Sequence, residues 1–448
     1  MLKRATPIAR AVASRPRPWV ERGLVLFAVA LALRLAYAWV AVGPHGQPYY
    51  DPLEFDTVAW NLARGFGFAL DSGGVHYPSA TSPPLLPWIT SLLYRAIGHH
   101  YFAAVVMQCV IGSLAPGLLA VFGTAMFGSA VGRLAAWLAA IHPLLVFISG
   151  YLLTETLFLT TLLLALVLSV DWVKTPRPAR AVGAGFAWGI ANLARPTALL
   201  LPLALFVWAW VPLGLTLSAR ERMRQMVMLL LGMALVIAPW TLRNAIVLHV
   251  FVPVAARSGG ALLAGNNAVV WNDPVMRGGA ATDLWVPEIL GERRTLTEPQ
   301  LQALTQARAL AFLREHVTEW PAMALAKLKR FWRLRAEGGG TGSWQLPGSP
   351  LEPLLARIDP LLVWSAAILP FALWGLMLAL RGPRRWFQSL SLWVILYFMM
   401  ITVVFFGSLR MRIPIEPLVV LFAAAGIDDA RRRLRTRARG LAVVRGTR

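Results

Sequence analysis

The sequence predicts an all-α, polytopic membrane protein with about ten transmembrane helices. Hydrophobic residues make up 57% of the 448 residues and charged residues only 14%, against about 25% charged in typical soluble domains. The apolar residues are gathered in runs of about 20, the length that crosses a hydrocarbon core about 30 Å thick. The 43 Lys and Arg residues fall in short clusters between these runs, which is the pattern of loops held on the cytoplasmic side.

Hydropathy places the predicted spans in chain order at 23–42, 101–123, 129–148, 152–170, 181–195, 197–217, 225–241, 360–380, 388–407 and 413–427. If the spans alternate in direction, every basic cluster falls on the same side of the membrane, which is then cytoplasmic. The first apolar run follows a basic segment, as in a signal peptide. It is too long for the hydrophobic part of one, so an uncleaved first span is favoured.

This topology divides the chain into three parts. They are a basic cytoplasmic N-terminus at 1–22, a transmembrane domain at 23–427 and a basic cytoplasmic tail at 428–448. Two long segments of the transmembrane domain, 43–100 and 242–358, face outward. The second is expected to contain two helices broken at Pro321 that lie along the membrane interface.

Charge and cysteine content limit the partners. The net charge of +22 is spread over the loop clusters, so membrane lipids are expected partners and nucleic acid is not. The single cysteine, Cys109, excludes an internal disulfide and a thiolate metal cluster. No pair of histidines has the spacing of metal ligands. Lys327, Lys329 and Arg330 are expected to contact lipid headgroups.

Scarce acids gather in the stretch "YYDPLEFDTVAWNLARGFGFALD" at 49–71. Asp51, Pro52 and Glu54 have the order of an N-cap, a first helical residue and a third one, so they predict a helix that runs to Gly65. Two interpretations stay open, because a capping carboxylate also keeps an oxygen free for chemistry. Asp51 and Glu54 share one helix face, whereas the other acids of the stretch, Asp56 and Asp71, receive no role.

Other charged residues lie at the outer ends of the predicted spans. Glu155 opens the fourth span, and an acid at membrane depth is a candidate functional residue. The structural alternative is a buried ion pair of Glu155 with Arg34. Arg410 and Arg412 precede a Pro-x-x-Pro start of the last span, where both can reach a phosphate at the membrane surface. Their structural alternative is interfacial snorkelling.

Two further arginines, Arg195 and Arg243, are predicted to face outward, where the positive-inside bias disfavours basic residues. This departure from the bias makes each of them a candidate phosphate ligand.

The acidic stretch at 49–71 resembles the first outer loop of the GT-C membrane glycosyltransferases. It is most similar to the bacterial relatives of protein O-mannosyltransferases and aminoarabinose transferases (the glycosyltransferase family 39-like group), with Phe55 in place of the usual Tyr. Five further motifs of that family follow in the expected order: "TSPPLLPWITSLLY" (81–94), "YLLTETLFLTTLLLAL" (151–166), "APWTLRN" (238–244), "LLAGNN" (262–267) and "RMRIPIEPL" (410–418).

The resemblance implies a glycosyltransferase that moves a sugar, hexosyl or pentosyl, from a polyprenyl-phosphate donor with inversion. It makes Asp51 the catalytic base, because a carboxylate can take the acceptor proton during attack on the anomeric carbon. Glu155 would be a second acid that orients the acceptor or a cation, and Glu54 would support the loop. The leaving lipid phosphate needs cationic or metal stabilisation, so the resemblance gives Arg410 and Arg412 the donor phosphate and leaves a divalent metal cation open.

The expected location is the bacterial inner membrane, with the active site facing the periplasm or exterior. The acceptor, whether lipid, glycan or protein, is left open. The competing hypothesis is a polytopic lipid or glycan transporter or flippase without transferase activity. Against it, the sequence has no inverted hydropathy repeat and no matching pair of broken spans. A non-catalytic assembly protein is a third class, and the retained Asp51 and Glu155 argue against it.

Overall fold

The computed structural model describes residues 18–214, 216–281, 296–335, 358–382 and 384–446. Parts of the predicted N-terminus (1–17), of the second outer segment (282–295 and 336–357) and of the tail (447–448) lie outside the described residues. Within the described part the protein is helical apart from one short hairpin, so the all-α prediction is confirmed. The bundle is formed by α2 (Pro18–Ala41), α5 (Tyr101–Phe127), α6 (Ser129–Ala140), α7 (Pro143–Ser149), α8 (Thr154–Lys174), α9 (Pro178–Ala194), α10 (Leu201–Gly214), α11 (Ala219–Leu248), α18 (Pro360–Arg381), α19 (Arg385–Gln388), α20 (Leu390–Val404) and α22 (Glu416–Gly446).

Each predicted span coincides with one of these helices or with a broken pair. Six described helices are long and apolar enough to cross a membrane, or seven if α6 and α7 form one span bent by 53°. The bend falls at His142 and Pro143, because proline cannot continue the hydrogen-bond ladder of α6. The remaining predicted spans fall on α9, on α10 and on the start of α22. The chain is therefore a multi-pass membrane protein.

The first outer segment forms α3 (Asp51–Arg64), a hairpin of β1 (Ala69–Ser72) and β2 (Val75–Pro78), and α4 (Leu85–Ile97). The strands pair antiparallel, with Ala69 opposite Pro78. Helix α3 ends where the sequence predicts, because Gly65 adopts the left-handed conformation (φ 89°) that closes a helix without a steric penalty.

The second outer segment forms α12 (Ser258–Ala264), α13 (Ala268–Asn272), α15 (Glu298–Glu315), the 3-10 turn η3 (Val317–Glu319) and α16 (Trp320–Phe331). The predicted break between two helices is present, but it precedes Pro321. Proline lies in the first turn of α16, where its missing N–H has no partner to lose.

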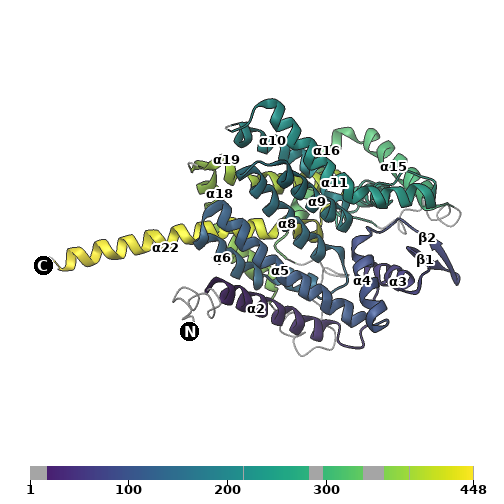
Figure 1. The fold of residues 1–448 in the computed structure, drawn as a ribbon, viewed down its shortest axis with the longest axis horizontal. Coiled ribbons are helices and arrows are strands. Elements are labelled where there is room, and N and C mark those ends of the chain that lie inside the picture. The colour runs from purple at the N-terminus through teal and green to yellow at the C-terminus, as the bar shows by residue number, and fades with distance from the viewer. Residues whose placement is uncertain (1–17, 215, 282–295, 336–357, 383, 447–448) are drawn as a thin grey trace, which may run out of the picture.

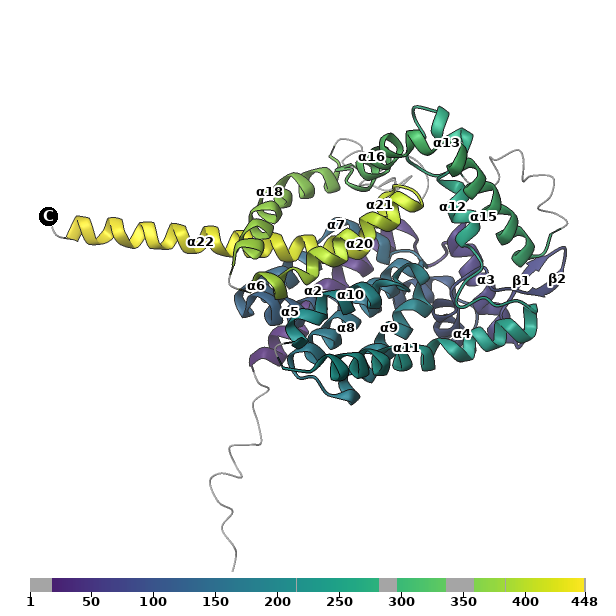
Figure 2. The same ribbon diagram turned by 90° about the horizontal axis from the view of Figure 1, so that it is seen from above.

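The two outer segments gather at one end of the molecule, and the far part of α22 projects from the opposite end (Figure 1). The same division is seen from above, where α12, α13 and α15 lie on the hairpin side (Figure 2). At that opposite end, α8 meets α19: the ammonium group of Lys174 lies 5.4 Å from the ring centroid of Phe387.

Helix α8 lies at the centre of the bundle, and most of its side chains are buried. Close helix packing around it depends on glycines. A Cβ atom at Gly185 of α9 would lie 1.9 Å from the carbonyl oxygen of Leu229 of α11, and one at Gly189 would lie 2.5 Å from Val236. Small residues four positions apart let two membrane helices approach at backbone distance, so Gly185 and Gly189 hold α9 against α11.

We expect Gly185→Val to lower the thermal unfolding temperature of the purified protein. The branched side chain would force α9 and α11 apart, and overpacking costs typically about 1–3 kcal/mol. Gly183→Val on the same helix is the matched control, because a Cβ atom there meets nothing within 4 Å. Melting followed by tryptophan fluorescence in detergent measures both. Equal melting temperatures for the two variants would contradict the close-packing account.

Candidate active site

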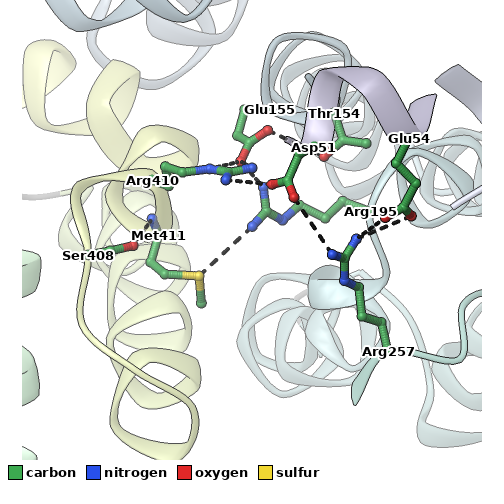
Figure 3. Close-up of polar contacts among 9 residues, drawn as sticks. All are labelled: Asp51, Glu54, Thr154, Glu155, Arg195, Arg257, Ser408, Arg410 and Met411. Carbon is green, nitrogen blue, oxygen red and sulfur yellow. Dashed lines mark hydrogen bonds and ion pairs between the residues drawn. The ribbon is translucent and has the colours of Figure 1, made fainter. Parts of the chain in front are cut away.

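Four chain segments meet at the end of the bundle that carries the outer loops. They are the start of α3, the start of α8, the end of α9 and the short helix α21 (Leu409–Arg412), which leads through the 3-10 turn η5 (Ile413–Ile415) into α22. Each supplies one charged side chain to a single cluster: Asp51, Glu155, Arg195 and Arg410 (Figure 3).

Arg410 lies between the two carboxylates of this cluster. Its Nε donates to Glu155 Oε1 at 2.7 Å, and its Nη1 donates to Asp51 Oδ2 at 2.7 Å. A planar guanidinium group suits this role, because its donors point in fixed and different directions. Arg410 thereby fixes the relative positions of two carboxylates that lie on different helices.

Glu155 is fully buried and is balanced by two cations. Besides Arg410 it pairs with Arg195, whose Nη1 lies 2.6 Å from Oε1. A charge with no access to water is tolerated only when it is paired. The alternative partner, Arg34, is buried elsewhere and donates to the carbonyl oxygens of Ala30 and Ala140.

The prediction that Asp51 caps α3 is wrong. The helix begins at Asp51 itself, the residue before it is Tyr50 with φ 54°, and no side chain caps this end. The backbone N–H groups of Leu53 and Glu54 donate to the Tyr50 carbonyl oxygen instead. The carboxylate of Asp51 is turned toward Arg410, because an ion pair with a guanidinium is stronger than a capping bond to a neutral N–H.

The charges around Asp51 keep it ionised. Burial alone would raise the pKa of Asp51, but Arg410 and Arg257 outweigh this and hold that pKa below its usual value. The side chain remains 32% exposed, so a substrate group can reach it from the open side.

Arg257 is a member of the cluster that the sequence did not single out. It precedes α12, with its Nη2 3.6 Å from Asp51 Oδ1 and its Nη1 3.2 Å from Glu54 Oε2. Glu54 also accepts a hydrogen bond from the Ser82 hydroxyl. Like Arg195, Arg257 is a basic residue at a position predicted to face outward, so the departure from the positive-inside bias was the pattern that could have found it.

Two predicted phosphate ligands lie outside the cluster. Arg412 is buried, pairs with Glu416 at 2.5 Å and donates to the Arg333 carbonyl oxygen at 2.6 Å, so it ties α21 to α22 and α16. Arg243 donates to the carbonyl oxygens of Ser79 and Phe68, so it anchors the hairpin loop. The structure engages both guanidinium groups in holding the fold together.

The other two acids of the stretch at 49–71, Asp56 and Asp71, bind residues of the outer segment itself. Asp56 is buried and binds the Tyr94 hydroxyl and, at 2.8 Å, His99 Nε2. Asp71 binds His76 across the hairpin and accepts a hydrogen bond from Asn61 of α3. Both carboxylates therefore brace the outer loop.

A buried joint positions the segment that carries Arg410. Lys327 Nζ donates to Asn266 Oδ1 at 2.7 Å and to the Val403 carbonyl oxygen at 3.0 Å, and Asn266 Nδ2 donates to the Val404 carbonyl oxygen. These bonds attach α16 and the "LLAGNN" turn to the end of α20, a few residues before Arg410. Lys327 is 2% exposed, so the expectation that it contacts lipid headgroups is wrong.

The cluster does not offer the ligand set of a divalent metal. In the described part of the chain, no group of three or more His, Cys, Asp or Glu side chains is arranged to hold a metal ion. The Arg410 guanidinium fills the space between Asp51 and Glu155, where a metal bound by both would lie. The positive charges that neutralise Asp51 and Glu155 here are guanidinium groups.

Comparison with known proteins agrees with this architecture. The model of the dolichyl-phosphate-mannose-protein mannosyltransferase family matches residues 81–242. No curated protein matches the sequence. Among solved structures, the oligosaccharyltransferase AglB of Archaeoglobus fulgidus, in complex with an inhibitory peptide and a dolichol-phosphate, is similar with a TM-score of 0.56 at 14% identity, over 94% of this chain and 52% of that one.

A second similar structure is ArnT of Cupriavidus metallidurans bound to undecaprenyl phosphate. It has a TM-score of 0.55 at 16% identity, over 95% of this chain and 63% of that one. The chain thus spans about half to two thirds of the length of these proteins. Its fold is that of the GT-C membrane glycosyltransferases, and the resemblance found in the sequence is confirmed.

We expect Glu155→Gln to destabilise the protein by roughly 3 kcal/mol, because it leaves Arg195 and Arg410 without their buried counter-charge. The variant should melt at a lower temperature and express less well. Asp171→Asn is the control: its ion pair with Arg180 is exposed and should contribute less than about 1 kcal/mol. A Glu155→Gln protein as stable as Asp171→Asn would show that the buried pairing does not support the fold.

The burial of Lys327 should make the stability of the protein depend on pH. Burial lowers the pKa of Lys327 to about 8, whereas an unfolded lysine titrates near about 10.4. The unfolded chain therefore binds more protons between these values, and the free energy of unfolding rises with pH across that window.

We expect Lys327→Met to remove this rise, on the order of 2 kcal/mol between pH 8 and pH 10, as measured by melting in a pH series. Lys329→Met, at an exposed position of the same helix, should keep it. An unchanged pH dependence in Lys327→Met would contradict the assignment.

Proposed function

We propose that this protein is a glycosyltransferase that moves a sugar from a polyprenyl-phosphate donor to an acceptor at the outer face of the plasma membrane. The observation that carries the proposal is the single guanidinium of Arg410 between Asp51 and Glu155. This guanidinium group links the partly exposed carboxylate of Asp51 to the buried Glu155, at the end of the bundle that bears the outer loops. A sugar bonded to a lipid phosphate needs both the carboxylate and the cation at once.

In this proposal Asp51 is the catalytic base. An acceptor hydroxyl oxygen attacks the anomeric carbon, its proton passes to the Asp51 carboxylate, and the bond between the anomeric carbon and the phosphate oxygen breaks. Attack from the face opposite the leaving group inverts the configuration. The electron pair of the broken bond stays on the polyprenyl phosphate, which leaves as an anion and requires no proton.

Arg410 and Arg195 are the proposed ligands of that leaving phosphate. Preorganised cations aimed at developing negative charge lower the barrier most where water is excluded, and both arginines are anchored on the buried Glu155. Glu155 therefore orients the cations. The names of the similar proteins support a lipid-linked donor: AglB was solved with a dolichol-phosphate and ArnT with undecaprenyl phosphate.

The orientation follows from the positive-inside pattern, with the cluster on the side away from the basic loops. In a bacterial cell this is the periplasmic side of the inner membrane. The proposal covers hexose and pentose donors, and lipid, glycan and protein acceptors. Purified protein incubated with radiolabelled polyprenyl-phosphate sugars and a membrane extract tests it, because label must pass to the acceptor. Label that crosses the bilayer without transfer would instead indicate a flippase.

We expect Asp51→Asn to lower transfer by at least about a hundredfold, since an amide cannot accept the acceptor proton. The exchange keeps the size of the side chain, and the melting temperature should show that the protein remains folded. Asp71→Asn is the matched control, because it removes an acid of the same outer segment that binds His76 and Asn61 and does not contact the charged cluster. Unchanged transfer in Asp51→Asn would exclude Asp51 as the base.

A further inference from the structure

The three arginines of the cluster are held very differently. Arg195 and Arg410 both pair with Glu155, which is fully buried, at distances of 2.6 and 2.7 Å. Among the residues that the structure describes, the partners of Arg257 are Asp51 and Glu54, at 3.6 and 3.2 Å, and its side chain is 49% exposed. Figure 3 shows it reaching the two carboxylates from the side opposite Arg410.

The contacts of Arg257 are of a kind that exchanges easily. Ion pairs open to solvent contribute little to stability, because water solvates the separated charges well. Glu54 keeps a partner when Arg257 leaves, since it also accepts from the Ser82 hydroxyl and is 20% exposed. Asp51 keeps Arg410. The displacement of Arg257 therefore leaves no charged group buried and unpaired.

We propose that Arg257 is an exchangeable anion ligand. Its guanidinium group releases the carboxylates of Asp51 and Glu54 and then binds the phosphate of the lipid-linked donor. The inference rests on the proposed function of this cluster and assigns a residue that the proposed chemistry did not use. A guanidinium suits the exchange, because its parallel N–H donors fit a phosphate as well as they fit a carboxylate.

The exchange also controls the proposed base. The charged groups that face Asp51 are Arg410 from α21, Arg257 from the segment before α12, Glu155 from α8 and Glu54 from its own helix. When Arg257 moves to a phosphate, and the phosphate also shares Arg410, the pKa of Asp51 rises. Asp51 is then a stronger base with the donor phosphate bound than without it, which favours transfer of the acceptor proton to Asp51 when the donor is in place.

Binding of undecaprenyl phosphate tests the inference without any need for catalysis. We expect Arg257→Gln, in full-length protein reconstituted in phosphatidylcholine nanodiscs, to weaken this binding by about tenfold, the usual effect of losing one charged hydrogen bond. Arg257→Lys should lie in between, because it keeps the charge and loses the fork. Arg314→Gln, at an exposed position of α15, is the control and should bind as the wild type does.

Two further arms separate the sources of phosphate. Inorganic phosphate and phosphatidylglycerol are tested as competitors of undecaprenyl phosphate. Neither should displace it at equal concentration from wild-type protein. If either does so, and Arg257→Gln removes that competition, the residue serves a free phosphate or a general anionic headgroup, and the inference is overturned.

A pair of variants links Glu54 to Arg257. Glu54→Gln releases Arg257 and should tighten the binding of undecaprenyl phosphate. In the double variant with Arg257→Gln the gain should be absent, because the interaction of the two residues is what the double-mutant cycle measures. An equal gain in both backgrounds would show that Glu54 acts on the phosphate directly.

The pH profile of transfer tests whether Arg257 acts on Asp51, because a purely structural role of Arg257 would not shift this profile. The acid limb of kcat/KM reports the free enzyme and that of kcat the bound one. Arg257→Gln should move the acid limb of kcat/KM to higher pH and leave that of kcat in place.

If wild-type protein binds undecaprenyl phosphate and Arg257→Gln binds it with equal affinity, this inference is overturned and the proposed function stays intact. Wild-type protein that does not bind it overturns both.

Discussion

The burial of the Glu155 carboxylate is the constraint on which the rest of the site depends. A carboxylate with no exposed surface must be neutralised by cations within contact distance, and Glu155 takes Arg195 from the end of α9 and Arg410 from α21. Arg410 then reaches Asp51 at the start of α3. One buried charge thus gathers the ends of helices that are far apart in the sequence.

The cluster is graded from inside to outside. Its inner part is a buried carboxylate held by two guanidinium groups, and its outer part is an exposed arginine with two carboxylates that water also reaches. In the proposed reaction the inner part holds its cations ready for the leaving phosphate, so little reorganisation is needed. The outer part can exchange partners at low cost, which suits the place where a substrate enters.

Charged residues of the same type have different roles in this protein, depending on the groups that they contact. Arg412 lies two positions from Arg410 and was predicted to share its role, yet it points into the interface of α21, α22 and α16 and binds Glu416. Lys327 was expected at a lipid surface and is instead a buried link between α16 and α20. Asp51 was expected to cap its helix and binds two arginines. Local patterns identified charged positions correctly but not the groups that they contact.

The sequence by itself predicted the helices of the bundle, the two long segments between them and the common end of the bundle at which Asp51, Glu155, Arg195 and Arg410 lie. Apolar run length and the placement of Lys and Arg are local properties that the bilayer imposes directly. Only the tertiary structure decided which of these charges pair, since Asp51 and Arg410 are 359 positions apart and their contact depends on how the helices pack. Packing also brought in Arg257 and turned Arg243 and Arg412 to structural use, because buried charges take the partners that the fold places within reach.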